Sequence, residues 1–291
     1  KFRLIVMNFL QYAIWGSWLI SLGAYLGGGL DFTGLQIGSF FATMGVASLF
    51  MPAVMGIIAD RWIPAQKLLG ICHLVSGGFL IAAASQTAYG PLYSCMLLSV
   101  MFYMPTIALS NSVAYNALDL ARLDTVKHFP PIRVWGTVGF IAAMWFVDLT
   151  HIGGVQIKLT EWQLYVSAVL SFLLSVYSFS LPGCPVDRNV KARSWVDTLG
   201  LRAFTLFKEK RMAIFFVFSM LLGAALQITN AFGDSYIQSF GSMPQYADSA
   251  IVKHSVILLS LSQMSETLCI LLIPFFLRRF GIKKVMLISM L

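Results

Sequence analysis

The sequence predicts an all-α polytopic membrane protein, and three observations indicate this class. Of the 291 residues, 58% are hydrophobic and only 11% are charged, whereas a soluble domain carries about 25% charged residues. The mean hydropathy is +0.79. Apolar runs recur along the chain at about the 20 residues that a helix needs to cross a bilayer. Too few charged side chains remain to cover a water-soluble surface, so the expected surroundings are lipid.

Eight complete spans are predicted, each a mainly apolar run followed by a short polar turn, and a ninth begins near residue 285. A helix is the expected form of every span, because lipid offers no partner for unpaired backbone groups. The predicted spans are 4–28, 36–58, 67–86, 91–113, 131–149, 162–182, 211–235 and 254–277.

Basic residues are distributed unequally between the two sides of these spans. With the N-terminus in the cytoplasm, only Lys158 and Lys253 of the 20 Lys and Arg residues fall on the other side, which leaves 18 on the cytoplasmic side. Such an excess is typical of cytoplasmic loops. We therefore expect the N-terminus to be cytoplasmic, and the net charge of +8 does not indicate a nucleic-acid partner.

The longest polar stretch, 183–210, predicts a cytoplasmic linker between two bundles of helices. A short amphipathic helix near 194–208 is one interpretation of it, and an ordinary loop is the other. Six spans, a charged linker and further spans are the layout of a two-bundle transporter. The expected domains are an N-terminal six-helix bundle at 1–182, the linker at 183–210, and the start of a C-terminal bundle at 211–291.

A glutamate in the eighth predicted span is the clearest candidate for function. Of the 12 Asp and Glu residues, Glu266 is the one placed well inside a span, where a charge costs about 2.5–3.5 kcal/mol. Gln263 lies three residues earlier and shares its helix face. The pair is expected to face a cavity, and the alternative is a structural glutamate bonded between helices.

Two further spans carry polar or aromatic side chains at helical spacing. Gln227 and Asn230 share one face of the seventh span, where amides can bind a ligand or bond neighbouring helices. Arg133, Thr137 and Phe140 share a face of the fifth span. Phe140 can stack on a base, whereas Arg133 is equally well explained as a side chain that reaches the membrane surface.

Several stretches resemble known families. Asp60 and Arg61 after Gly56, followed by Lys67, resemble the loop motif of the major facilitator superfamily, although Ile63 and Pro64 depart from it. More specific stretches resemble the bacterial nucleoside:proton symporter family along essentially the whole chain. They are QYAIWGSWLISLGAYL (11–26), FPPIRVWGTVGFI (129–141), KRMAIFFVFSMLLGAALQITNAFG (210–233) and SQMSETLCILLIPFF (262–276).

This resemblance implies a major facilitator fold of two six-helix bundles, the second of them incomplete in this sequence. It implies a proton-coupled nucleoside transporter of the bacterial inner membrane, for which we expect a monomer and no cofactor or metal. Glu266 is expected to take part in proton coupling, and Asp60, Arg61 and Lys67 are expected to form a cytoplasmic gate. The implied nucleoside-binding residues are Arg133, Thr137, Phe140, Gln227, Asn230, Gln263 and Glu266.

Other functions were weighed against this one. A membrane enzyme is not expected, because the sequence carries no HExxH or GxSxG motif and no paired intramembrane acids. A major facilitator transporter for another small polar solute, such as a sugar, stays open as an alternative. A sensor that binds a nucleoside without moving it is also compatible with the sequence.

Overall fold

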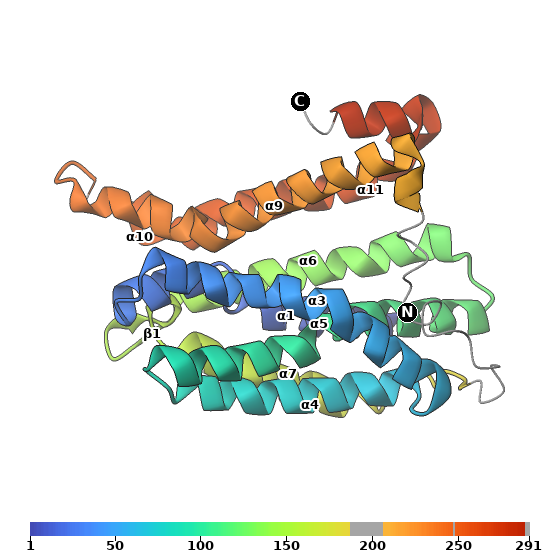
Figure 1. Cartoon of the computed structure of the whole chain (residues 1–291), viewed down its shortest axis with the longest axis horizontal. Helices are drawn as coiled ribbons and strands as arrows, with labels where there is room; N and C mark the ends of the chain where they lie inside the picture. Colours follow the sequence, from blue (N-terminus) through green and yellow to red (C-terminus); the bar gives the residue numbers. More distant parts are fainter. Residues whose placement is uncertain (187–205, 247, 289–291) are drawn as a thin grey trace.

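The computed structural model describes residues 1–186, 206–246 and 248–288, and nearly all of its regular structure is helical (Figure 1). The short amphipathic helix considered near 194–208 lies largely outside the described residues. The longer described helices are α1 (Phe2–Gly16), α3 (Gly34–Arg61), α4 (Ala65–Ala84), α5 (Tyr89–Leu120), α6 (Thr125–Leu149), α7 (Trp162–Ser178), α9 (Lys210–Ser239) and α11 (Ser255–Ile288).

Five of the described helices are long and apolar enough to cross a membrane. Helix α7 is apolar but shorter. The predicted all-α polytopic class is confirmed. The five are α3, α4, α5, most of α6 (Lys127–Leu149), and α9 with its continuation (Lys210–Ser242).

The first predicted span, 4–28, is not one uninterrupted helix. Helix α1 is followed by a turn, by the short α2 (Leu22–Ala24), and by the π-helical η1 (Tyr25–Gly29). The Ser17 hydroxyl donates to the Ala13 carbonyl over 2.8 Å, and a hydroxyl that bonds back into its own helix tends to bend it. Hydropathy alone does not detect such a bend.

Two other boundaries differ from the prediction for a related reason. Helix α5 continues to Leu120 and α6 begins at Thr125, whereas the predicted spans ended at 113 and began at 131. The added turns carry polar side chains, so an apolar-run criterion does not include them. Near the C-terminus, Gly281 breaks α11 with φ 73°, close to where a ninth span was expected.

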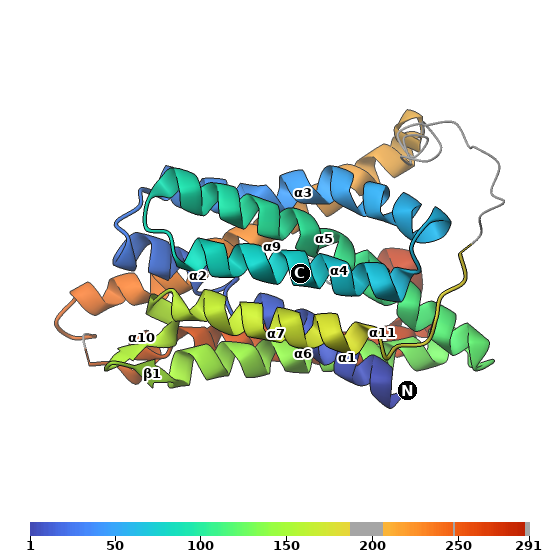
Figure 2. The ribbon, with the colours of Figure 1, turned by 90° about the horizontal axis from the view of Figure 1, so that it is seen from below.

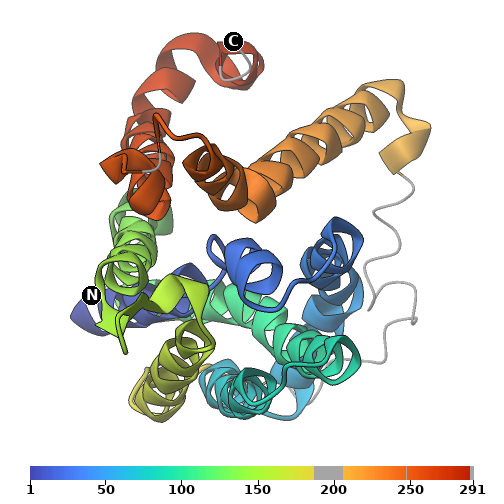
Figure 3. The ribbon, with the colours of Figure 1, turned by 90° about the vertical axis from the view of Figure 1, so that its left-hand side faces the viewer.

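Helices α1 and α3–α7 pack together as one group, with α4 against α5 and α7, and α1 against α6. Figure 3 shows α9 to α11 along one side of this group, and Figure 2 shows the same helices from below. Contacts between the two groups run through α6 with α11 and through α2 with α9.

The two ends of the molecule differ in their connections (Figure 1). The N-terminus, the α3–α4 turn and the α5–α6 turn lie at one end. The opposite end holds α10 (Ala250–Lys253), the 3-10 turns η2 (Ile157–Leu159) and η4 (Phe240–Ser242), and a hairpin of β1 (His151–Ile152) and β2 (Val155–Gln156). We call the latter the hairpin end.

The hairpin is closed by Gly153 and Gly154, both with positive φ (61° and 85°). Ile152 pairs with Val155, so the turn between them has two residues. Two-residue turns of this kind need positive φ at both positions, which glycine adopts without strain. The turn fixes where Gln156 and the following residues lie relative to the end of α6.

Candidate functional site

Helices α1 and α6 approach each other unusually closely, because glycine occupies the points of contact. A Cβ atom on Gly139 would overlap the Phe9 carbonyl oxygen, and one on Gly16 would overlap the Phe140 carbonyl oxygen. Small residues allow membrane helices to pack backbone against backbone. This contact fixes the face of α6 that carries Arg133, Thr137 and Phe140 against α1.

A cavity of about 130 Å³ lies between α1, α6, α9 and α11. It contains six of the seven predicted binding residues, drawn from three helices that are far apart in sequence. Thr137 and Phe140 are buried, while Glu266 remains exposed. The lining residues are Tyr12, Trp15, Leu19, Arg133, Thr137, Phe140, Leu226, Asn230, Gln263 and Glu266.

The seventh predicted residue, Gln227, lines a neighbouring cavity of about 490 Å³ between α3 and α9. Trp15 lines both cavities, so they adjoin each other at this side chain. Within the part of the chain that the structure describes, the buried Gln227 Nε2 and Trp15 Nε1 atoms have no hydrogen-bond partner. A buried donor without a partner costs about 1–3 kcal/mol, and a bound polar ligand is one way to remove that cost.

Tyr12 is a cavity residue that the sequence reasoning did not identify. The Arg133 guanidinium carbon lies 3.8 Å from the centre of the Tyr12 ring, a distance typical of a cation–π contact. The buried Arg133 Nη1 atom has no hydrogen-bond partner among the described residues. Tyr12 lies one helical turn before Trp15, so helical spacing from Trp15 was the available signal.

Aromatic rings brace the wall of the cavity behind these polar groups. The Trp15 ring meets Phe140 edge to face, with centroids 6.4 Å apart, and meets Tyr103 at 6.0 Å. The Tyr103 hydroxyl donates to the Gln11 carbonyl over 2.7 Å. Phe140 is therefore held in one orientation by α1, with its ring at the cavity.

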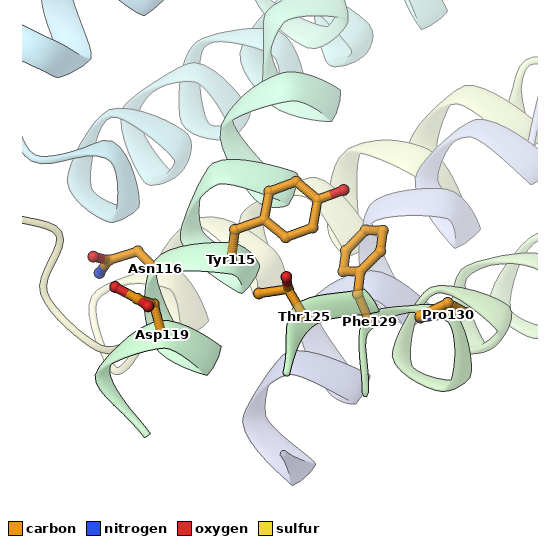
Figure 4. A pocket seen from close by; sticks show the side chains of 6 residues that line it. All are labelled: Tyr115, Asn116, Asp119, Thr125, Phe129 and Pro130. Carbon is orange, nitrogen blue, oxygen red and sulfur yellow. The ribbon is translucent and has the colours of Figure 1, made fainter. Parts of the chain in front are cut away.

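The proposed gating residues lie elsewhere, around the α3–α4 turn. Arg61 ends α3 and is half-buried, while Asp60 and Lys67 are exposed. At the same end of the molecule, a cavity of about 600 Å³ opens between the end of α5 and the start of α6. Figure 4 shows its lining side chains, which include Tyr115, Asp119 and Phe129.

The described residues contain no group of three or more His, Cys, Asp and Glu side chains that could hold a metal ion. The polar groups of the central cavity are instead one carboxyl group, one guanidinium group, two hydroxyl groups, one indole N–H and two amides. These groups can bind a small solute with several donors and acceptors. Apolar helices around a polar central cavity define a polytopic membrane transporter for a small polar solute.

The comparisons with known proteins identify the family. The chain belongs to the family described as nucleoside H+ symporter, which matches residues 1–291. It is 53% identical over 288 residues to the xanthosine permease of Escherichia coli (strain K12), covering 99% of this chain and 68% of that protein. It is 48% identical over 289 residues to the nucleoside permease NupG of the same organism, with the same coverage of each.

A solved structure agrees with the sequence match. The crystal structure of the nucleoside transporter NupG is similar to this chain with a TM-score of 0.86 at 48% identity, covering 99% of this chain and 70% of that one. A mutant of NupG gives a TM-score of 0.90. The predicted family and the transporter class are therefore confirmed.

Proposed function

We propose that the protein takes up nucleosides together with protons by alternating access of the central cavity to the two sides of the membrane. The observation that carries the proposal is the cavity between α1, α6, α9 and α11, which gathers an acid, a base and amides with aromatic rings. The names of the two permease relatives support nucleosides as the substrate class.

The binding roles follow from the chemistry of each side chain. Phe140 stacks on the base, because every base presents a π-face. Thr137, Asn230 and Gln263 bind hydroxyl or carbonyl groups, and Gln227 does so from the neighbouring cavity. Arg133 is held in place by the Tyr12 ring, and its guanidinium group donates hydrogen bonds to acceptor atoms of the ligand.

Glu266 takes part in proton coupling in this proposal. Its carboxyl group lines the same cavity as the side chains proposed to bind the ligand. Proton occupancy of Glu266 and affinity for the ligand can therefore depend on each other. The inward proton gradient then drives uptake, since moving one charge is worth about 2.3 kcal/mol per 100 mV.

The arrangement in the membrane is part of the same proposal. A multi-pass protein of the bacterial inner membrane is proposed with its N-terminus and the linker 183–210 in the cytoplasm, which places the hairpin end outside. The proposed units are the bundle 1–182 and the start of a second bundle at 211–291. Asp60, Arg61 and Lys67 act as the cytoplasmic gate, and the working unit is a monomer.

Uptake into vesicles tests the function directly. Labelled nucleoside should accumulate when an inward proton gradient is imposed, and Glu266→Gln should abolish accumulation while leaving nucleoside exchange, because a glutamine binds but does not titrate. If accumulation by Glu266→Gln falls only in step with its affinity, Glu266 holds the ligand without coupling.

Counterflow separates transport from sensing. Vesicles preloaded with unlabelled nucleoside should draw in labelled nucleoside without a gradient. Binding without counterflow would instead support a nucleoside sensor, and counterflow of a sugar but not of a nucleoside would support a carrier for another polar solute.

A further inference from the structure

A buried cluster of charged groups lies at the hairpin end, apart from the central cavity. Asp148 and Lys158 are 0% and 1% exposed and form an ion pair of 2.6 Å. Both belong to the part of the chain before the linker: Asp148 lies at the end of α6, and Lys158 follows the hairpin in η2. The sequence reasoning treated Lys158 only as a loop charge and placed neither Asp148 nor Asp234 well inside a span.

A second carboxylate is buried on the facing side. Asp234 of α9 is 0% exposed and accepts hydrogen bonds from the Ser255 hydroxyl and, over 2.9 Å, from Gln238 Nε2. Both donors follow the linker, as Asp234 does. We call Asp148, Lys158, Asp234, His254 and Ser255 the hairpin-end cluster.

Hydrogen bonds join the two sides across this cluster. His254 Nδ1 lies 2.7 Å from Asp148 Oδ2. Lys158 Nζ donates to the Lys253 carbonyl over 2.9 Å and to the Ser255 hydroxyl over 3.3 Å. Gln156 Nε2 donates to the same Lys253 carbonyl over 3.4 Å. Each of these bonds connects α6 or the hairpin region with the end of α10, with His254 after it, or with the start of α11.

Burial along α9 and α11 shows the same asymmetry between the ends. The buried residues of α9 are Ala231 and Asp234, in its last third, and the buried Ser255, Val256 and Ser260 lie in the first turns of α11. The earlier turns of α9 expose large apolar side chains, including Phe215, Met220 and Leu226. The two groups of helices are therefore packed together at the hairpin end.

We propose that the hairpin-end cluster is the outer gate of the transport path and holds the conformation seen here closed on that side. The assignment rests on the proposed function and on the proposed orientation, which place the hairpin end outside. Opening this side means separating residues 145–158 from residues 253–260, which breaks the bonds of His254, Gln156 and Lys158 to the opposite side.

The way the charges are shared makes this gate reversible. When the two sides separate, Asp148 keeps Lys158, and Asp234 keeps its bonds from Ser255 and Gln238, so each carboxylate retains its partners from its own side. A buried charge left without its partner would be costly. Opening therefore costs the hydrogen bonds between the sides and leaves the ion pair intact.

Labelling of one cysteine from the outside tests the gate. Leu226→Cys places a thiol at the central cavity in a protein whose four natural cysteines are replaced by alanine. An impermeant thiol reagent added to right-side-out vesicles should label it slowly. Adding His254→Ala or Gln156→Ala should raise that rate about fivefold each, the expected effect of one lost net hydrogen bond of about 1 kcal/mol.

Lys253→Ala is the matched control, because it removes a charge from the same loop while keeping the carbonyl group that accepts from Lys158 and Gln156. The Lys253 side chain pairs with the exposed Asp248 over 3.0 Å, within the same side. Its labelling rate should equal that of the parent. An unchanged rate in both His254→Ala and Gln156→Ala, or an equal increase in Lys253→Ala, would overturn the gate.

Failure of the gate and failure of the proposed function give different results. If the increase is seen only in inside-out vesicles, the cluster gates the path and the orientation is wrong. If the labelling responds as expected but the parent protein shows no nucleoside counterflow, the gate stands and the proposed function falls.

Discussion

Two sites between the same groups of helices use charge in opposite ways. In the hairpin-end cluster, Asp148 has Lys158 and His254 as partners within 2.7 Å, and Asp234 accepts two hydrogen bonds. Among the described residues, Arg133 Nη1 and Trp15 Nε1 at the central cavity and Gln227 Nε2 at the neighbouring one are buried without a hydrogen-bond partner. Polar groups that are already paired stabilise a conformation, whereas unpaired ones are available to a ligand.

The largest expected effect comes from breaking the paired site. Asp148→Asn leaves Lys158 buried beside a neutral side chain, and removing one partner of a buried ion pair costs about 3–5 kcal/mol. Thermal unfolding in detergent should show a large drop in Tm. The double variant Asp148→Leu with Lys158→Met should recover most of that loss, and equal Tm values for single and double variants would contradict the pairing.

The unpaired site should respond in binding and not in stability. Gln227→Ala and Asn230→Ala should each weaken nucleoside binding by about 1–3 kcal/mol, because the ligand loses a hydrogen bond to a buried partner. The Tm of Gln227→Ala should hardly change, since Gln227 Nε2 has no hydrogen-bond partner among the described residues. Isothermal titration measures the binding. Normal affinity in both variants would mean that these amides only join helices.

The wall of the cavity depends on backbone packing, which a methyl group can disturb. Gly139→Ala should push α1 away from α6, because the added Cβ overlaps the Phe9 carbonyl, and overpacking costs about 1–3 kcal/mol. Binding and Tm should fall together, unlike in the amide variants. Gly78→Ala on α4 is the control, as nothing lies within 4 Å of its Cβ position.

The smallest expected effect is on the labelling of a cysteine, and it tests which side of the membrane each end of the molecule faces. Cys184 follows α7 and is half-buried, and burial raises the pKa of its thiol. At neutral pH the thiolate fraction is then lower than for a free thiol, so labelling by a maleimide should be slower and should speed up as the pH rises. An impermeant reagent should miss Cys184 in intact cells. Labelling from outside would reverse the proposed orientation.

The helices could be predicted from the sequence because each apolar run carries its own signal. The cavity could be predicted in part. Gln263 shares a helix face with Glu266, and Thr137 shares one with Phe140, because helical spacing does not depend on the rest of the fold. That these faces meet at one cavity depends on how α6, α9 and α11 pack, which helical spacing does not specify. The family resemblance supplied that step.

The hairpin-end cluster could not be found in this way. Asp148 lies at the end of a predicted span, Lys158 in a loop and His254 at the start of another span, so each has an ordinary explanation alone. Their contacts join positions about a hundred residues apart. One signal was present: Lys158 is one of only two basic residues on its predicted side of the membrane, and such an isolated charge suggests a search for a buried counter-ion.

The glycine contact between α1 and α6 has a consequence for how substrate selectivity is maintained during a transport cycle. Backbones that touch at Gly16 and Gly139 cannot slide past each other without collision, so Tyr12, Arg133 and Phe140 travel as one rigid template. Asn230, Gln263 and Glu266 line the same cavity from α9 and α11, and the proposed alternating access repositions them relative to this template. In the proposed transport cycle, the fixed template decides which solute is recognised, and the moving wall decides how tightly that solute is held on each side.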